Sequence, residues 1–196
     1  MKHNGFEYVD LGLPSGTKWA TCNVGANSET DYGLYFACGG IVGVDSLCCD
    51  NDFDSNKIRY DVKEKATLHI DNDAAHMHMG GKWHMPTKEQ FEELLDEKNT
   101  VSTWLHDYCN SGVSGRLFRS RINNETLFIP ANGFINNHAL YRKDVNCSIW
   151  TSSLDFSTVY SCICLFCDSD NASISQISAY YIGMGIRGVF NTFWVK

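Results

Sequence analysis

The sequence predicts a single α+β domain that spans residues 1–196. Three observations lead to this class. Two helix-type segments lie in the front half of the chain, many short strand-type segments follow them, and no linker, repeat or low-complexity tract divides the chain. The 196 residues suit one domain, and 43% hydrophobic with 20% charged residues is typical of a globular protein with a sizeable core.

Two segments carry the signals of helix ends. Residues 71–81 begin with acidic residues and end with two glycines, which predicts a short helix with a cap at each end. In residues 87–97, Thr87 and Gln90 have the spacing of a capping box. The apolar residues of this second segment fall on one helical face: Phe91, Leu94 and Leu95. We therefore expect a second helix over residues 87–97 with one buried side.

Short alternating segments predict mainly antiparallel strands. The expected strands cover residues 6–11, 17–24, 100–105, 116–120, 126–130, 149–151, 159–166 and 182–190. We expect residues 41–68 to be irregular and residues 132–147 to form a long polar loop with embedded aromatic residues. The expected core consists of large apolar residues from helices and strands: Trp19, Trp83, Phe91, Leu94, Leu95, Phe128 and Trp150.

The charge of the chain limits its partners. The formal net charge is −7, and basic residues never cluster beyond Arg142 and Lys143. We therefore expect no nucleic-acid binding. No stretch approaches the roughly 20 apolar residues that span a bilayer, so direct membrane insertion is not expected. The first residues lack the apolar region of a secretory signal. This predicts a cytoplasmic protein, one that leaves the cell by another route such as lysis inside a virus particle, or one whose signal was removed.

Nine cysteines is a high and odd number, so a complete set of disulfides within the chain is impossible. Without a secretory signal, reduced thiols are the expected state. Structural zinc takes four ligands, usually as two close pairs. Besides Cys162, Cys164 and Cys167 the chain has no second Cys-x-x-Cys, and the adjacent Cys48 and Cys49 have poor geometry for binding one metal. We therefore expect neither a metal site nor a cofactor.

The most unusual composition lies in residues 154–181. This window contains no lysine, arginine, glutamate, methionine or tryptophan, but it holds six serines, three cysteines and three tyrosines. The flanking segments 149–153 and 183–189 have the composition of ordered structure. One interpretation is a fixed frame that displays residues selected for something other than folding. The alternative is a serine-rich buried strand with a loop, since strands also contain few lysines and glutamates.

Three sets of motifs occur in a recognisable order. The first is YVDLGLPSGTKWATCNVGA at residues 8–26, with DYG and FA by residue 37. The second runs through residues 73–94 and includes GGKWHMPTKEQFEEL. The third comprises FIPANG at 128–133, WTSS at 150–153 and GIRGV at 185–189. Together they resemble the paralogous domain abundant in Bacteroidetes and Fibrobacter. That domain is similar to the formylglycine-generating-enzyme branch of the C-type lectin fold, which also includes the variable proteins of diversity-generating retroelements.

The resemblance covers nearly the whole chain and implies a C-type lectin fold. Such a fold has two helices packed on short, mainly antiparallel strands, with a long irregular loop region. In the retroelement proteins, template adenines are randomised and the changes fall near the C-terminus. Asparagine-type codons changed in this way encode serine, tyrosine, cysteine or aspartate, but not lysine, glutamate, methionine or tryptophan. The window 154–181 matches that set, apart from Gln176, which we interpret as a fixed position.

The resemblance therefore implies a ligand-binding display protein, virion-associated or on a cell surface. It implies a variable region at about 132–183 and a protein or glycan on a cell surface as the partner. Aromatic side chains supply much of the energy of such surfaces, and serine and asparagine supply adaptable hydrogen bonds. For each tyrosine, ordinary partial burial is the alternative. The candidate ligand-binding residues are Tyr160, Cys162, Cys164, Phe166, Asp168, Asn171, Ser173, Tyr180, Tyr181, Asn136, His138 and Tyr141.

Two other functions stay open at the level of sequence. The formylglycine-generating branch includes an oxidase with two cysteines and a bound metal. Cys162 and Cys167 lack its flanking motif, and residues 154–181 contain no lysine, arginine or histidine to lower a thiol pKa. We therefore expect no enzyme and no catalytic residues. The other alternative is a structural or adhesin-type domain of a surface lipoprotein, in which residues 154–181 are an ordinary strand and loop.

Overall fold

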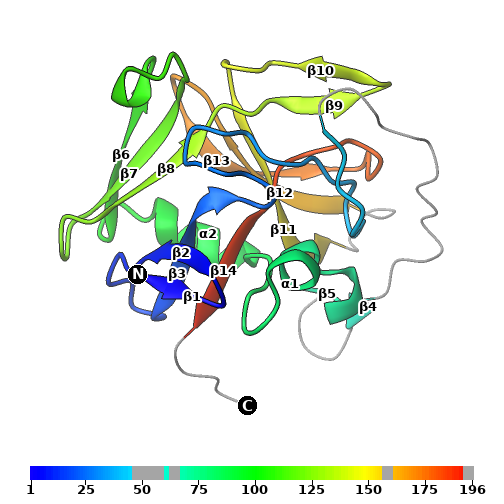
Figure 1. Cartoon of the computed structure of the whole chain (residues 1–196), viewed down its shortest axis with the longest axis horizontal. Coiled ribbons are helices and arrows are strands. Elements are labelled where there is room, and N and C mark those ends of the chain that lie inside the picture. Colours follow the sequence, from blue (N-terminus) through cyan, green and yellow to red (C-terminus); the bar gives the residue numbers. More distant parts are fainter. Residues whose placement is uncertain (46–59, 62–66, 156–160, 192–196) are drawn as a thin grey trace.

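Strands dominate the structure, and this corrects the predicted fold class. The computed structural model describes residues 1–45, 60–61, 67–155 and 161–191. Strands make up 44% and helices 12%, and the described residues contain two α-helices, of six and eight residues. Several antiparallel sheets build the molecule (Figure 1). The expected α+β class with a helix-on-strand C-type lectin arrangement is therefore wrong, because the helical segments are too short to form a layer of their own.

The first sheet brings the two ends of the described chain together. It contains β1 (Lys2–His3), β2 (Phe6–Val9), β3 (Thr17–Asn23) and β14 (Arg187–Asn191) in the order β1-β2-β3-β14. All neighbouring strands are antiparallel. The predicted strands 6–11 and 17–24 are present in shortened form, and only the end of the predicted strand 182–190 joins this sheet.

The second sheet contains most of the compositionally unusual window. Its order is β13-β12-β11-β5-β4, again antiparallel throughout. The strands are β4 (Tyr60–Asp61), β5 (Thr67–Leu68), β11 (Cys147–Asp155), β12 (Ser161–Cys167) and β13 (Ala172–Ile177). β11 and β12 overlap the predicted strands 149–151 and 159–166, of which residues 159 and 160 lie outside the described residues. β13 lies where a loop was expected, and β4 and β5 fall in the segment 41–68 that was expected to be irregular.

Two smaller sheets complete the strand framework. β6 (Thr100–Leu105), β7 (Gly115–Ser120) and β8 (Thr126–Pro130) form an antiparallel three-stranded sheet close to the predicted bounds. β9 (Phe134–Asn136) and β10 (Ala139–Tyr141) form a hairpin inside the segment that was expected to be a loop. The hairpin lies beyond one end of the second sheet (Figure 1).

Both predicted helices are present, but α1 is shorter than the predicted segment 71–81, while α2 begins where the sequence predicts. The side chain of Thr87 accepts a hydrogen bond from the backbone of Gln90, and Gln90 accepts one from the Thr87 amide, so the capping box of α2 (Lys88–Leu95) is confirmed. This helix stops two residues earlier than predicted, because Asp96 has an extended backbone. A 3-10 turn, η2 (Ile70–Asn72), precedes α1 (Ala74–Met79), and another, η3 (Tyr108–Asn110), follows β6.

Asp73 anchors the start of α1 from a buried position. Its carboxylate accepts a hydrogen bond from the His76 amide at 2.8 Å and bonds from the Met85 amide at 2.8 and 3.0 Å. Burial raises the pKa of this carboxyl group against the opposing effect of these bonds. One side chain therefore caps the helix and also holds the extended segment that follows it.

Two hydrophobic clusters lie on opposite faces of β12. Cys162 and Cys164 belong to the first cluster, whereas Leu165 and Cys167 belong to the second. This division follows the alternation of side chains along a strand. The predicted core residues are confirmed as buried, with Leu95 only partly buried: Trp19, Trp83, Phe91, Leu94, Phe128 and Trp150.

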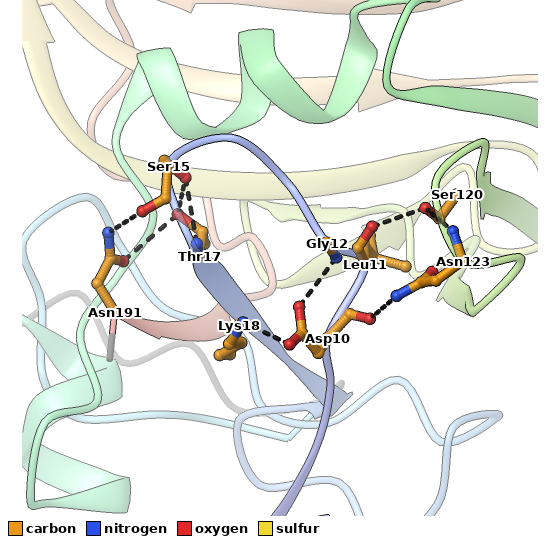
Figure 2. A network of polar contacts seen from close by, with 9 residues as sticks. All are labelled: Asp10, Leu11, Gly12, Ser15, Thr17, Lys18, Ser120, Asn123 and Asn191. Atoms are coloured by element: carbon orange, nitrogen blue, oxygen red, sulfur yellow. Dashed lines mark hydrogen bonds and ion pairs between the residues drawn. The ribbon is translucent and has the colours of Figure 1, made fainter. Parts of the chain in front are cut away.

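A polar network fixes the loop that connects β2 to β3 (Figure 2). Asp10 forms an ion pair with Lys18 at 2.5 Å and accepts a hydrogen bond from the Gly12 amide at 2.9 Å. Partial burial would raise the pKa of Asp10, but the hydrogen bonds and the charge of Lys18 lower it overall. The hydroxyl of Ser120 donates to the carbonyl of Leu11 at 2.6 Å, which ties the loop to the three-stranded sheet.

Arg187 joins the first sheet to the three-stranded sheet from within the core. Its guanidinium donates to the carbonyl oxygens of Ala20 and Phe128, each at 3.1 Å. The side chain is fully buried, and this burial lowers its pKa to about 10. The arginine of the GIRGV motif is therefore part of the frame and lies away from the solvent.

Candidate ligand-binding surface

The unusual window runs through buried and exposed structure in turn. It includes the end of β11, all of β12, the turn at 168–171, β13 and the loop at 178–181. β12 pairs with a neighbour on each side. Side chains alternate between its two faces, and the face that holds Cys162 and Cys164 is covered by the first hydrophobic cluster. Most of β12 therefore lies in the core and is not part of a ligand-binding surface.

Two of the predicted ligand-binding residues, Cys162 and Cys164, cannot contact a ligand. Cys162 forms a disulfide with Cys38, which lies 124 residues earlier in the chain. Cys164 is fully buried, and burial raises its pKa to about 12. Both predictions need correction because these side chains fill the core. The expectation of reduced thiols is also wrong for Cys38 and Cys162.

Phe166 and Ser173 share the same face of the sheet closer to its edge. They are direct partners in the pairing of β12 with β13, and both side chains are half-buried. β13 is the outermost strand of the sheet, so this part of the face is less covered than the part beneath Cys164. These two predicted residues therefore lie at the solvent boundary.

Asp168 and Asn171 shape the turn between β12 and β13. The carboxylate of Asp168 accepts hydrogen bonds from the amides of Asp170 and Asn171, each at 2.9 Å, and these bonds lower the pKa of Asp168. Arg116 donates to the Asp168 carbonyl at 2.9 Å. β13 has six residues, which at about 3.3 Å per residue puts this turn roughly 20 Å from the loop at 178–181. The predicted residues therefore divide into two groups.

The second group begins with the β9–β10 hairpin. Its strands are joined by Asn137 and His138, which both have positive φ angles of 46° and 62°. Asparagine tolerates this conformation, and two such residues match the tight two-residue hairpin turn. Phe134 and Tyr141 stack across the base of the hairpin with ring centroids 5.8 Å apart. The hairpin therefore presents His138 at its exposed tip and Tyr141, which is 46% exposed, at its base.

The hairpin is held beside the loop at 178–182 by backbone bonds. The Ile135 amide donates to the Gly183 carbonyl at 2.8 Å, and the Gly183 amide returns the bond at 2.9 Å. Gly133 lets the chain return close to itself, because a Cβ atom at this position would lie 2.1 Å from the Tyr141 carbonyl oxygen. Neither contact depends on an exposed side chain.

Tyr180 and Tyr181 differ in their surroundings. Tyr180 packs against the first hydrophobic cluster, and its carbonyl accepts a hydrogen bond from the Cys38 amide at 2.9 Å. Tyr181 is 57% exposed, and its ring lies edge-on to that of Tyr180 with centroids 5.9 Å apart. The Cys38–Cys162 disulfide lies next to this loop, since Ile177, the last residue of β13, is the pairing partner of Cys162.

The hairpin and the loop, joined by these backbone bonds, carry five of the predicted residues. We call this group the tyrosine surface, and its members are Asn136, His138, Tyr141, Tyr180 and Tyr181. Asn136 is half-buried within β9. Tyr160, also predicted, lies outside the described residues.

Tyr32 is a neighbour that the sequence did not predict. Its hydroxyl donates to the carboxylate of Asp144, just after the hairpin, and Lys143 lies 4.9 Å from the centre of its ring. Burial and the charge of Asp144 raise the pKa of Tyr32. The pairing of residues more than a hundred positions apart leaves no local sequence signal.

We also searched the described residues for a cleft, a metal site and a membrane-spanning helix. A cleft of about 370 Å³ between β3 and the β1–β2 hairpin is lined in part by Lys2, Phe6 and Cys22, and no predicted site residue lines it. Within the described ranges, no group of three or more histidine, cysteine or acidic residues is arranged to hold a metal. None of the described helices is long and apolar enough to cross a bilayer.

Comparisons with protein-family models, with curated proteins and with solved structures gave no significant match.

Proposed function

We propose that this chain is a ligand-binding display protein, a diversity-generating retroelement variable protein whose tyrosine surface binds a protein or glycan on a cell surface. One observation carries the proposal. The exposed aromatic residues lie on two segments whose backbones are bonded to each other and to the core. A surface built in this way accepts new side chains without a change of frame.

The chemistry of the surface suits binding by contact. Tyr141 and Tyr181 offer large, rigid rings that lose little entropy on binding. His138, at the exposed tip of the hairpin, adds hydrogen-bonding groups. Arg142, Lys143 and Asp144 follow the hairpin and add charges of both signs at its edge. This mixture of aromatic and polar groups is typical of adaptable binding surfaces.

The burial of each side chain decides where we expect the sequence to vary. Cys162 and Cys164 occupy the core, so substitution there would disturb the frame. His138, Tyr141 and Tyr181 face the solvent and accept new side chains at low cost. The proposal therefore places variation at the exposed positions of residues 132–183, with β12 held constant as the support.

The disulfide supports a location outside the reducing cytoplasm. Disulfides persist in oxidising surroundings, on cell surfaces and on virions. The bond between Cys38 and Cys162 fits a protein that acts at such a surface. The oxidase alternative is not favoured, because Cys162 is bonded and burial raises the pKa of Cys164 and Cys167.

The proposal is tested by binding of labelled protein to a panel of bacterial cells and to a glycan array. The Tyr141→Ala, Tyr181→Ala double variant should lose about tenfold or more in affinity for any cell or glycan that the parent binds. Val101→Ala on β6 is the matched control, since Val101 is also an exposed apolar residue. Equal binding by the double variant and the parent would contradict the proposal and favour a structural, adhesin-type domain.

The genetic part of the proposal has its own test. DNA beside the gene should encode a reverse transcriptase and a template copy of the variable region. In that copy, adenines should fall in the codons of exposed residues such as His138, Tyr141 and Tyr181. Adenine changes concentrated in the codons of buried residues, such as Ile163 and Leu165, would contradict it.

A further inference from the structure

Two buried thiols face each other at one end of the β11–β12 pair, in the second sheet. Cys147 on β11 and Cys167 on β12 are direct partners in the antiparallel pairing of these strands. Both are 0% exposed, and both belong to the second hydrophobic cluster. The Cys147 thiol donates a hydrogen bond to the Ile129 carbonyl at 3.2 Å, and Cys167 interacts in turn with Cys147.

Their placement matches the geometry of a disulfide. Directly opposite residues of antiparallel strands have Cα atoms about 4.5 or 5.5 Å apart, depending on the type of pair. Disulfides join residues whose Cα atoms are about 4.4–6.8 Å apart. Side chains of opposite residues also point to the same face of the sheet. The register of Cys147 and Cys167 is therefore the kind that a disulfide can join.

We propose that Cys147 and Cys167 form a second disulfide when the protein folds under oxidising conditions. The proposal does not rest on the proposed function. The bond would close a loop within one β-hairpin and join β11 to β12. Since Cys162 and Cys167 lie on opposite faces of β12, the two disulfides would tie this strand on both sides. Cys164, on the same strand, belongs to the first cluster and so lies on the opposite face from Cys147.

The chemistry requires an oxidant of the disulfide class, such as oxidised glutathione. One protein thiolate attacks a sulfur of the oxidant and releases one reduced glutathione, which leaves a mixed disulfide. The second protein thiol then displaces the other glutathione. In total the protein loses two protons and two electrons, which reduce oxidised glutathione to two molecules of reduced glutathione. Full burial of Cys147 and Cys167 in the native state means that the exchange takes place during folding.

The test is a peptide map of protein refolded in a mixture of reduced and oxidised glutathione, then alkylated with iodoacetamide. Cleavage on the amino side of aspartate gives three peptides of interest. Peptide 31–44 contains Cys38, peptide 144–154 contains Cys147, and peptide 155–167 contains Cys162, Cys164 and Cys167. The proposal predicts that all three peptides run as one disulfide-linked species. Release of 144–154 with alkylated Cys147, or its link to any other cysteine, would overturn the proposal.

Single substitutions identify the partner within the last peptide. Cys167→Ser should release peptide 144–154 from the linked species and lower Tm under oxidising conditions by about 5–10 °C. Cys164→Ser is the matched control, since it is buried on the same strand and should leave the species intact. Release by Cys164→Ser but not by Cys167→Ser would contradict the assignment. If a variant does not fold, the peptide map of the parent protein decides.

Discussion

Ile135 and Gly183 exchange two backbone hydrogen bonds, although one lies in the β9–β10 hairpin and the other follows the loop at 178–182. This bridge places the exposed ring of Tyr141 and the exposed ring of Tyr181 on segments held in a fixed relation. Because the bridge uses main-chain atoms, it does not depend on the exposed side chains of Tyr141 and Tyr181. The tyrosine surface therefore depends on the path of the chain more than on its own residues.

Gly133 should be essential to this path. Gly133→Ala introduces a Cβ atom that would lie 2.1 Å from the Tyr141 carbonyl oxygen, at a φ of 64° that disfavours alanine. We expect a loss of about 2–4 kcal/mol in the free energy of unfolding, measured by urea denaturation. Gly112→Ala is the control, since its φ is also positive and nothing lies within 4 Å. Equal losses for both variants would show that the close approach is not as described.

The Cys38–Cys162 disulfide should stabilise the whole domain. Cys38→Ser removes a link between residues 124 positions apart, and we expect the free energy of unfolding to fall by about 2–5 kcal/mol. Guanidinium denaturation under non-reducing conditions measures the change. Cys109→Ser, at an exposed free cysteine, should have little effect. An unchanged midpoint in Cys38→Ser would mean that the link does not form.

Asp73, at the start of α1, should also stabilise the folded protein. Asp73→Ala removes the cap of the helix and the partner of the Met85 amide. We expect a loss of about 2–4 kcal/mol in the free energy of unfolding. Asp73→Asn keeps an acceptor for the His76 amide, so its loss should be smaller, as measured by the same denaturation. A larger loss in Asp73→Asn than in Asp73→Ala would contradict this role.

The Asp10–Lys18 ion pair should add a dependence on pH. The folded pKa of Asp10 is lowered below its ordinary value of 3.8, so the unfolded chain binds the proton more readily. The ion pair therefore adds stability above about pH 4 and loses it as pH falls through the folded pKa. Asp10 is partly exposed, which limits the effect to about 1 kcal/mol or less. Asp10→Asn should reduce the fall in Tm between pH 6 and pH 3, and an unchanged fall would contradict the ion pair.

Short sequence patterns correctly predicted several helices and strands whose formation depends on nearby residues. The Thr87–Gln90 capping box is confirmed, and strands β6 and β8 have the predicted bounds. Such signals depend on residues within a few positions of one another. The large aromatic residues Trp19 and Trp150 are likewise buried as predicted.

The errors arose where long-range contacts decide the structure. β13 is rich in serine and is a strand because it pairs with β12, which no local pattern records. The same applies to Cys162, whose partner Cys38 lies far away in the chain. Alternation correctly separated the two faces of β12, but it cannot tell which face the rest of the chain covers. Five predicted site residues lie on the two segments of the tyrosine surface, while Cys162 and Cys164 lie in the core.

The central claim is that the frame is independent of the side chains it displays. The most direct measurement is the thermal unfolding of a variant that combines His138→Ala, Tyr141→Ala and Tyr181→Ala. Our account predicts a cooperative transition with a Tm within a few degrees of the parent, because these side chains are exposed. Loss of the cooperative transition, or a fall in Tm of more than about 10 °C, would mean that the displayed residues hold the fold together.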